Sequence, residues 1–170
     1  MPRAIVAVGT NQGDRVSNFT RAIERLKFVG TVLRVSGLYE TKPMYEENQP
    51  AFLNGAVLLD TKLGPLRLLT ELKRIEVEVG RVARFRNGPR EIDLDLIVYG
   101  VAQYRFVDKS QVRLQIPHPR LSERRFVLAP MADVWPDLDI PGLGPLDLIL
   151  RATDSQSVDV VTFDHGRVSL

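Results

Sequence analysis

Two aspartates, Asp93 and Asp95, lie two residues apart in the apolar stretch 92–99. Side chains alternate between the two faces of a strand, so both carboxylates are predicted to share one face. The apolar residues of the stretch are predicted to share the other face: Ile92, Leu94, Leu96 and Val98. Two like charges on one sheet face repel each other unless a cation neutralises them. A divalent metal ion would serve as that cation.

Four arginines precede the aspartate pair in the chain: Arg81, Arg84, Arg86 and Arg90. Guanidinium groups bind phosphate oxygens in forked pairs, and carboxylates bind Mg²⁺. The combination is what a magnesium–nucleotide site needs. The local pattern leaves a second interpretation open, in which the aspartates are solvated and the arginines form surface ion pairs with Glu76, Glu78 or Glu91.

Length and composition set outer bounds on the function. The chain has 170 residues, enough for one domain with its own core, and no cysteine, which excludes disulfides, thiolate metal sites and a cysteine nucleophile. Its net charge of +2 is too small for a general nucleic-acid binder. The apolar run at residues 4–9 is too short for a signal-peptide core or a membrane span, so we expect a cytoplasmic protein.

Hydrophobic periodicity predicts an α+β fold with a ferredoxin-like βαββαβ core. The predicted strands cover residues 3–9, 31–40, 52–61 and 92–99, and the predicted helices run from Val16 to near Gly30 and from Pro65 to Gly80. A C-terminal strand and helices are added to this core: an edge strand at 113–116, a helix at 122–134, a short helix at 145–151 and a weaker strand at 157–163. We therefore expect one domain over residues 1–150 and an extension of unknown role over 151–170.

Several segments, in order and with family-like spacing over roughly residues 4–142, resemble 6-hydroxymethyl-7,8-dihydropterin pyrophosphokinase. This folate-pathway enzyme transfers pyrophosphate from ATP to a pterin alcohol. The matching segments are Val8-Gly9-Thr10-Asn11, Tyr39-Glu40-Thr41, Phe52-Leu53-Asn54, Gly80-Arg81-Val82, Gly88-Pro89-Arg90-Glu91-Ile92-Asp93-Leu94-Asp95, Ile116-Pro117-His118-Pro119-Arg120-Leu121 and Arg124-Arg125-Phe126-Val127.

The resemblance implies a role for each matching residue. Asp93 and Asp95 would hold two Mg²⁺ ions on the ATP phosphates, and Arg81 and Arg90 would bind the phosphates as a loop closes. The implied pterin-binding residues are Thr41, Lys42, Pro43, Met44, Phe52, Asn54 and Phe126. The implied ATP-binding residues are Lys73, Glu76, Arg113, His118 and Arg124. Without the resemblance, Phe52 and Phe126 would be taken for core residues and His118 for a structural histidine in a proline turn.

The chain departs from the family pattern in two places. Asn87 stands where an aromatic residue usually precedes Gly-Pro-Arg, and the interval from Arg81 to Arg90 is one residue shorter, so closure over the pterin is expected to differ. The expected partners are ATP and the dihydropterin alcohol, with no nucleic acid and no membrane. A monomer is expected, and an oligomer is left open.

Two other functions remain as alternatives. One keeps the two-metal site and assigns a nucleotidyl or different phosphoryl transfer, as in polymerase-like palm domains. The other is a non-catalytic ferredoxin-like module that binds RNA or a protein. RNA-binding sheets of this topology present aromatic residues where this chain presents Asp93 and Asp95, which disfavours RNA binding.

Overall fold

The computed structural model describes residues 1–44 and 47–161. The strands are β1 (Arg3–Thr10), β2 (Thr31–Val35), β3 (Leu38–Thr41), β4 (Phe52–Asp60), β5 (Asp93–Tyr99), β6 (Tyr104–Asp108), β7 (Gln111–Ile116), β8 (Asp139–Ile140), β9 (Gly144–Pro145) and β10 (Asp159–Val161). The helices are α1 (Arg15–Leu26), α2 (Pro65–Val79), α3 (Arg125–Val134) and α4 (Leu146–Arg151), with a short 3₁₀ helix at Leu121–Glu123. None of the helices in this described part of the chain is long and apolar enough to cross a membrane.

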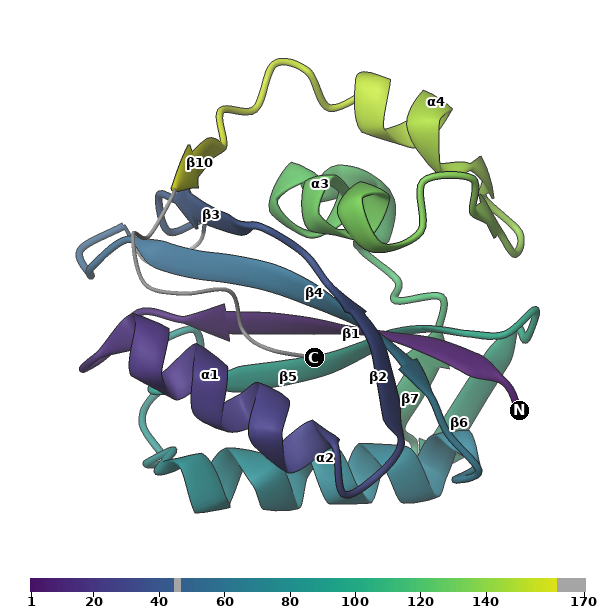
Figure 1. Ribbon diagram of the computed structural model, residues 1–170, viewed down its shortest axis with the longest axis horizontal. Coiled ribbons are helices and arrows are strands. Elements are labelled where there is room, and N and C mark those ends of the chain that lie inside the picture. Colours follow the sequence, from purple (N-terminus) through teal and green to yellow (C-terminus); the bar gives the residue numbers. More distant parts are fainter. Residues whose placement is uncertain (45–46, 162–170) are drawn as a thin grey trace.

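A six-stranded antiparallel sheet forms the centre of the molecule, and its order confirms the ferredoxin-like prediction. The hydrogen-bonded order is β10-β3-β4-β1-β5, with β2 also paired to β4. Helices α1 and α2 cover one face of the sheet, and α3 and α4 lie over the other (Figure 1). In the βαββαβ motif, β2 and β3 together are the second strand and pair with β4, the third strand. Strand β1 lies between β4 and β5, the last strand of the motif, as the pattern requires.

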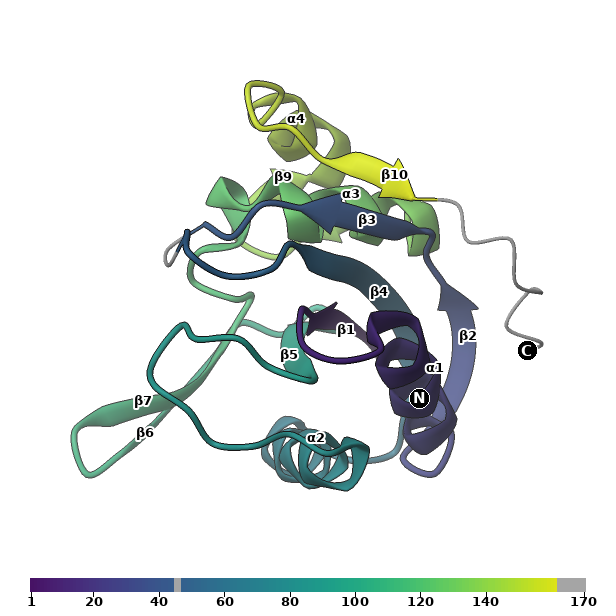
Figure 2. The same cartoon turned by 90° about the vertical axis from the view of Figure 1, so that its left-hand side faces the viewer.

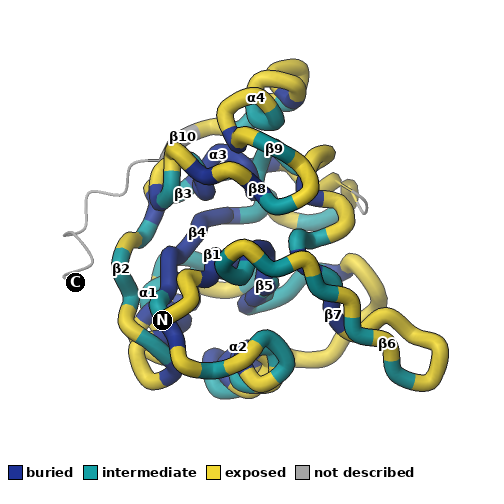
Figure 3. Tube along the Cα trace, turned by 90° about the vertical axis from the view of Figure 1, so that its right-hand side faces the viewer, coloured by how far each residue is buried: buried dark blue, intermediate teal, exposed yellow. Residues whose placement is uncertain are grey.

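Two hydrophobic clusters hold the helices to the sheet, one on each face. Leu68, Leu72 and Ile75 of α2 pack with α1 against one face. Leu128 and Met131 of α3 pack against the other face. The central strands are buried from both sides, whereas the hairpin formed by β6 and β7 is largely exposed (Figure 3). Most residues of the central strands are therefore buried and apolar, and the polar residues among them are exceptions.

Strand β5 places both aspartates on one face, as predicted, but the prediction for Val98 is wrong. Val98 packs with the α3 cluster, whereas Leu94 and Leu96 pack with the α2 cluster. The cause is a bulge: Val6 pairs with Leu96 and Ile5 pairs with Val98, so one residue is left over. An extra residue reverses the alternation of side chains beyond it.

Two element boundaries also differ from the prediction. The first helix ends at Leu26 rather than near Gly30, because two tight turns follow it and bury Val29 without continuing the helix. The single strand predicted over 31–40 is broken into β2 and β3. At the break, the Ser36 hydroxyl accepts a hydrogen bond from the Ala56 amide at 2.8 Å, so a side chain replaces a partner in the ladder.

The predicted edge strand at 113–116 belongs instead to a separate hairpin. Strand β7 pairs with β6 and not with the main sheet, and the hairpin projects from the body of the molecule (Figure 2). Its turn consists of Lys109 and Ser110, both at positive φ. Such a turn usually contains Asn or Gly, so the sequence offered no hairpin signal here.

A glycine in β4 allows helix α1 to approach the sheet closely. A Cβ atom at Gly55 would lie 2.5 Å from the Phe19 ring and 3.2 Å from the Ser36 hydroxyl. Gly55→Ala is therefore expected to lower the free energy of unfolding by about 2 kcal/mol, as overpacking does. Urea unfolding measures this, with Gly64→Ala as the control, since a Cβ there meets nothing within 4 Å. Equal stability of the two variants would contradict the tight packing.

The described part of the C-terminal extension packs on the core. Residues 151–156 lie against the start of α3, and β10 pairs with β3. The predicted tail strand over 157–163 is present at Asp159–Val161. Residues 162–170 lie outside the described part. So do residues 45–46, which follow the implied pterin-binding residue Met44.

Candidate active site

A cavity of about 310 Å³ opens where the ends of β1, β4 and β5 meet the start of α3. Most residues predicted to bind substrate or metal line it. They are Thr41, Lys42, Met44, Phe52, Asn54, Arg90, Asp93, Asp95, His118, Arg124 and Phe126. Segments far apart in the chain thus supply both charged and aromatic side chains to one cavity. The cavity also has small or apolar lining residues that the sequence did not indicate, among them Ala7, Gly9 and Val127.

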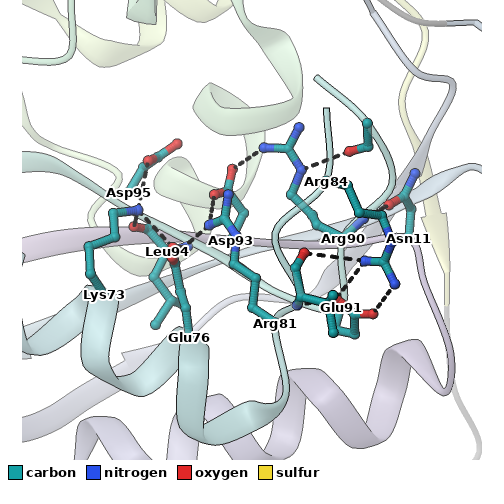
Figure 4. A network of polar contacts seen from close by, with 12 residues as sticks. Asn11, Lys73, Glu76, Arg81, Arg84, Arg90, Glu91, Asp93, Leu94 and Asp95 are labelled. Carbon is teal, nitrogen blue, oxygen red and sulfur yellow. Dashed lines mark hydrogen bonds and ion pairs between the residues drawn. The ribbon is translucent and has the colours of Figure 1, made fainter. Parts of the chain in front are cut away.

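The two aspartates have different partners. Asp93 is held by two arginines: its Oδ1 accepts from Arg81 at 2.8 Å and its Oδ2 from Arg90 at 3.1 Å (Figure 4). Asp95 has a longer ion pair, 4.0 Å from the Lys73 ammonium group, and 39% of its side chain is exposed. Asp95 is therefore the more available carboxylate for a ligand in the cavity.

This difference moves the two pKa values in opposite directions. Burial at the bottom of the cavity, where protein limits hydration, raises the pKa of Asp95 to about 6, and the charge of Asp93 adds to the effect. Burial also acts to raise the pKa of Asp93, but the positive charges of Lys73, Arg90 and Arg81 outweigh it and lower that pKa below its ordinary value. Neighbouring cations thus stabilise the charge of Asp93, whereas they do not fully balance the charge of Asp95.

The end of helix α2 places Arg81 beside Asp93. Gly80 adopts φ 113°, and the amides of Gly80 and Arg81 donate to the carbonyls of Val77 and Glu76, which is the Schellman arrangement. A hydrophobic contact usually joins the residue whose carbonyl accepts from the second amide to the residue after the glycine. Here an ion pair of 2.6 Å between Glu76 and Arg81 takes its place.

Glu76 is buried and completes the open edge of β5. Its Oε1 accepts from the Leu94 amide at 2.7 Å and from the Lys73 ammonium at 2.7 Å, while Lys73 also donates to the Leu94 carbonyl at 3.1 Å. Unpaired edge groups normally need another strand or water. With its other oxygen on Arg81, this carboxylate anchors both cations that flank the aspartates (Figure 4). The predicted ATP-binding residue Glu76 thus lies behind the cavity wall and is not among the lining residues.

The cavity also carries two aromatic rings and a fixed amide. The guanidinium of Arg90 lies 5.9 Å from the centre of the Phe52 ring, and that of Arg124 lies 5.8 Å from the Phe126 ring. The Asn54 side chain donates to the Thr41 hydroxyl at 2.7 Å, which fixes its orientation. Aromatic faces and an oriented amide suit a flat heterocycle with both donor and acceptor edges.

His118 lines the cavity, and its imidazole ring is neutral. Burial and the positive charges of Arg124 and Arg120 lower its pKa to about 4. Its Nδ1 accepts from the Arg120 amide at 3.2 Å, so the proton of the neutral ring is on Nε2. Nε2–H can then donate to an oxygen of a ligand across the whole neutral pH range.

The same shift predicts an effect on stability. Since the pKa of His118 is about 4 when folded and 6.5 ordinarily, the unfolded chain binds an extra proton between these values. Stability must then fall as the pH drops through that window. His118→Asn removes this contribution, so its loss of stability from pH 7 to pH 4.5 is expected to be smaller. Urea unfolding across this range measures it, and parallel curves for the two proteins would contradict the buried neutral histidine.

Five predicted site residues do not line the cavity, Glu76 among them. Arg113 is on the exposed hairpin, 3.6 Å from Asp108, and Pro43 follows Lys42 without lining the cavity. Neither Arg81 nor Lys73 lines it either, although both contact the aspartate pair.

Asn11 is a site residue whose role the sequence did not reveal. Its side-chain amide donates to the Gln49 side chain and the Pro50 carbonyl, while its oxygen accepts from the Arg90 amide. Gln49 in turn donates to the carbonyl of Asn87, which lines the cavity at φ 59°. The loops on both sides of the cavity are therefore joined. The sequence signals for Asn11 were its position after a strand and its place in the matching segment Val8-Gly9-Thr10-Asn11, neither of which indicated these contacts.

The chemistry of the donor set fits magnesium. Within residues 1–44 and 47–161, no group of three or more His, Asp or Glu side chains converges on one point. A pair of carboxylates is nevertheless the protein contribution that Mg²⁺ commonly takes, because it keeps several waters and substrate phosphates as ligands. The raised pKa of Asp95 also means that a cation beside the pair would relieve repulsion.

Comparisons with known proteins agree with the fold and the motifs. The family model described as 7,8-dihydro-6-hydroxymethylpterin-pyrophosphokinase (HPPK) matches residues 5–136. The 2-amino-4-hydroxy-6-hydroxymethyldihydropteridine pyrophosphokinase of Pseudomonas aeruginosa is 39% identical over 160 residues, covering 92% of this chain and 95% of the relative. A solved HPPK-DHPS structure from Plasmodium falciparum has a TM-score of 0.74 at 16% identity, over 91% of this chain and 46% of that one.

Longer relatives match as well. The "Folate synthesis bifunctional protein, mitochondrial" of Pisum sativum is 47% identical over 131 residues, which are 76% of this chain and 24% of the relative. The chain thus spans about a quarter of that protein's length. From the family model and the bacterial relative, matched over nearly its whole length, we conclude that the chain belongs to the HPPK family.

Proposed function

We propose that this chain transfers the pyrophosphoryl group of ATP to 6-hydroxymethyl-7,8-dihydropterin, giving AMP and the pterin diphosphate for folate biosynthesis. The observation that carries the proposal is the aspartate pair, which lines one cavity together with two arginines and two aromatic rings, and whose Asp93 is bound by Arg81 and Arg90. Family membership supports the same reaction, and the bacterial relative carries its name.

In this proposal Asp93 and Asp95 hold two Mg²⁺ ions, which when bound neutralise phosphate charge and polarise the phosphorus under attack. The chain's own residues respond to the ligand by exchanging partners. Arg81 and Arg90 now occupy both oxygens of Asp93, so sharing those oxygens with a metal frees their guanidinium groups for phosphate oxygens. His118, neutral with its proton on Nε2, donates to a further oxygen of ATP, and Arg124 adds positive charge.

The reaction needs no covalent enzyme intermediate. The hydroxymethyl oxygen of the pterin forms a bond to the β-phosphorus and releases its proton to water. The bond from that phosphorus to the bridging oxygen breaks, and its electron pair stays on the phosphate of AMP. Positioning and electrostatic stabilisation supply most of the catalysis in such transfers. The fixed charges around Asp93 and Asp95 provide both.

The pterin lies against the aromatic residues of the cavity in this proposal. Phe52 and Phe126 supply ring faces, and Asn54, oriented by Thr41, pairs with the polar edge of the heterocycle. Lys42, Pro43 and Met44 come from the adjoining loop. Asn87 takes the place of an aromatic residue and offers no ring face, so pterin affinity is expected to depend more strongly on Phe52 and Phe126.

The partners in this proposal are the two small substrates, with neither nucleic acid nor membrane, and the chain acts as a monomer in the cytoplasm. The pea relative carries the word mitochondrial in its name, so localisation can differ among relatives.

An assay of purified protein with ATP, Mg²⁺ and 6-hydroxymethyl-7,8-dihydropterin tests the proposal. Nucleotide products are separated by chromatography, with EDTA and pterin-free controls. AMP that needs the pterin and disappears with EDTA is the expected result. Release of free pyrophosphate instead of AMP would favour nucleotidyl transfer, and ADP as the product would favour a simple phosphoryl transfer.

A further inference from the structure

The first turn of helix α3 carries two of the cavity residues but has no local cap. Arg124 stands at the N-cap position and makes no side-chain capping hydrogen bond. The first amide of the helix, that of Arg125, donates instead to Oε1 of Gln156 at 3.1 Å, across 31 residues. An uncapped helix start leaves backbone donors unsatisfied, so the distant amide serves as the missing cap.

The same glutamine also binds the backbone before the helix. Its Nε2 donates to the Glu123 carbonyl at 2.8 Å. One side chain therefore pairs with a backbone group on each side of Arg124. This double contact restrains the turn in which Arg124 and Phe126 extend into the cavity.

Further contacts attach the surrounding segment, residues 150–161, which we call the C-terminal strap. The Arg125 guanidinium donates to the Leu150 carbonyl at 3.0 Å and to Asp154 at 2.7 Å. Thr153 is buried, and its hydroxyl donates to the Leu150 carbonyl at 2.7 Å. The strap is thus fixed to the start of α3 at several points.

The strap then continues to strand β3 of the main sheet. Its last residues form β10, in which Asp159 pairs with Glu40 and Val161 with Leu38 of β3 (Figure 2). The next residue of β3 is Thr41, which lines the cavity and orients Asn54. One segment therefore contacts α3, which carries Phe126, and β3, which carries the Thr41 that orients Asn54 of β4.

We propose that the C-terminal strap sets the positions of Phe126 in α3 and Thr41 in β3, two of the proposed pterin-binding residues, and that Gln156 is its main positioning residue. This inference rests on the proposed function, because it assigns the aromatic residues of the cavity to the pterin. Gln156 acts through Arg124 and Phe126 and does not contact the substrate. Loss of a helix cap costs about 1 kcal/mol, which corresponds to a change of about fivefold in an equilibrium constant.

Gln156→Met in the full chain is the central test, because methionine has similar length and lacks both hydrogen-bonding groups. Titration with the pterin in the presence of Mg²⁺ and a non-hydrolysable ATP analogue is expected to show about fivefold weaker binding. Steady-state kinetics should show the same rise in KM for the pterin with a smaller change in kcat. Amide hydrogen exchange should increase at residues 125–127.

Two further variants separate positioning from general stability. Gln156→Glu keeps an acceptor for the Arg125 amide and adds favourable charge at a helix start, but it replaces the donor to the Glu123 carbonyl with an oxygen, so it is expected to restore only part of the pterin affinity. Ser155→Ala, an exposed neighbour in the strap, is the matched control and should bind like the wild type.

The outcomes distinguish the two proposals. Normal pterin affinity in Gln156→Met, with the wild type active, would overturn the role of the strap and leave the proposed function standing. Absence of pterin binding and turnover in the wild-type chain would overturn the proposed function, and the strap inference with it.

Discussion

Replacing Asp95 with asparagine is expected to reduce turnover by about three orders of magnitude without lowering the stability of the chain. Burial and the charge of Asp93 raise the pKa of Asp95 to about 6, so its ionised form is unfavourable in the folded protein. The neutral amide removes that repulsion and also removes one metal ligand. Steady-state kinetics and thermal unfolding at pH 8 without Mg²⁺ measure the two effects.

The pH dependence of stability gives an independent readout of the same residue. Between its ordinary pKa of 3.8 and about 6, the folded chain binds more protons at Asp95 than the unfolded chain does. This contribution makes the wild type less stable as the pH rises through that window. Asp95→Asn is expected to lack it, so the stability gained by the substitution should increase from pH 4 to pH 6.5.

Asp93→Asn is the matched comparison, because it should abolish turnover and also destabilise the fold. Its pKa lies below the ordinary value, so the ionised form contributes stability above pH 3.8 that is lost at lower pH. Asparagine would leave Arg81 and Arg90 without that partner. Equal melting temperatures for the two variants, or substantial activity in either, would contradict these separate roles.

Glu76→Gln is expected to cause the largest loss of stability among the site variants, about 3 kcal/mol. Glutamine can still accept the hydrogen bond of the Leu94 amide, but it cannot balance the charges of Lys73 and Arg81. Those cations would then hold the aspartates less firmly, and turnover should fall with stability. Urea unfolding at neutral pH and steady-state kinetics provide the measurements.

Glu78→Gln controls for removing a glutamate from the same helix. The Glu78 side chain is 31% exposed and pairs with Arg74 and Arg25, so its loss should cost about 0.5 kcal/mol. If Glu76→Gln unfolds at the same urea concentration as this control, Glu76 does not anchor the edge of β5.

The sequence predicted the fold and the chemical groups of the site because both depend on local signals. Strand alternation put Asp93 and Asp95 on one face, and helical periodicity with Gly80 set the end of α2. The family resemblance then gave Phe52, Asn54 and Phe126 a role that composition alone would have assigned to the core. All three line the cavity.

The features that the sequence did not predict depend on tertiary contacts. The bulge that moves Val98 to the α3 side depends on how β1 pairs with β5. The place of Glu76 requires α2 to lie along the edge of β5, and Gln156 caps a helix that begins 31 residues before it. The β6–β7 hairpin was missed because Lys109 and Ser110 are unusual residues for its turn.

Tracing the terminal phosphate of ATP shows which group the protein transfers to the pterin. With ATP labelled at the γ-phosphorus, Mg²⁺ and the dihydropterin alcohol, the label is expected to appear in the pterin diphosphate while unlabelled AMP forms in equal amount. Label found in free pyrophosphate or inorganic phosphate, with none on the pterin, would contradict pyrophosphoryl transfer at this site.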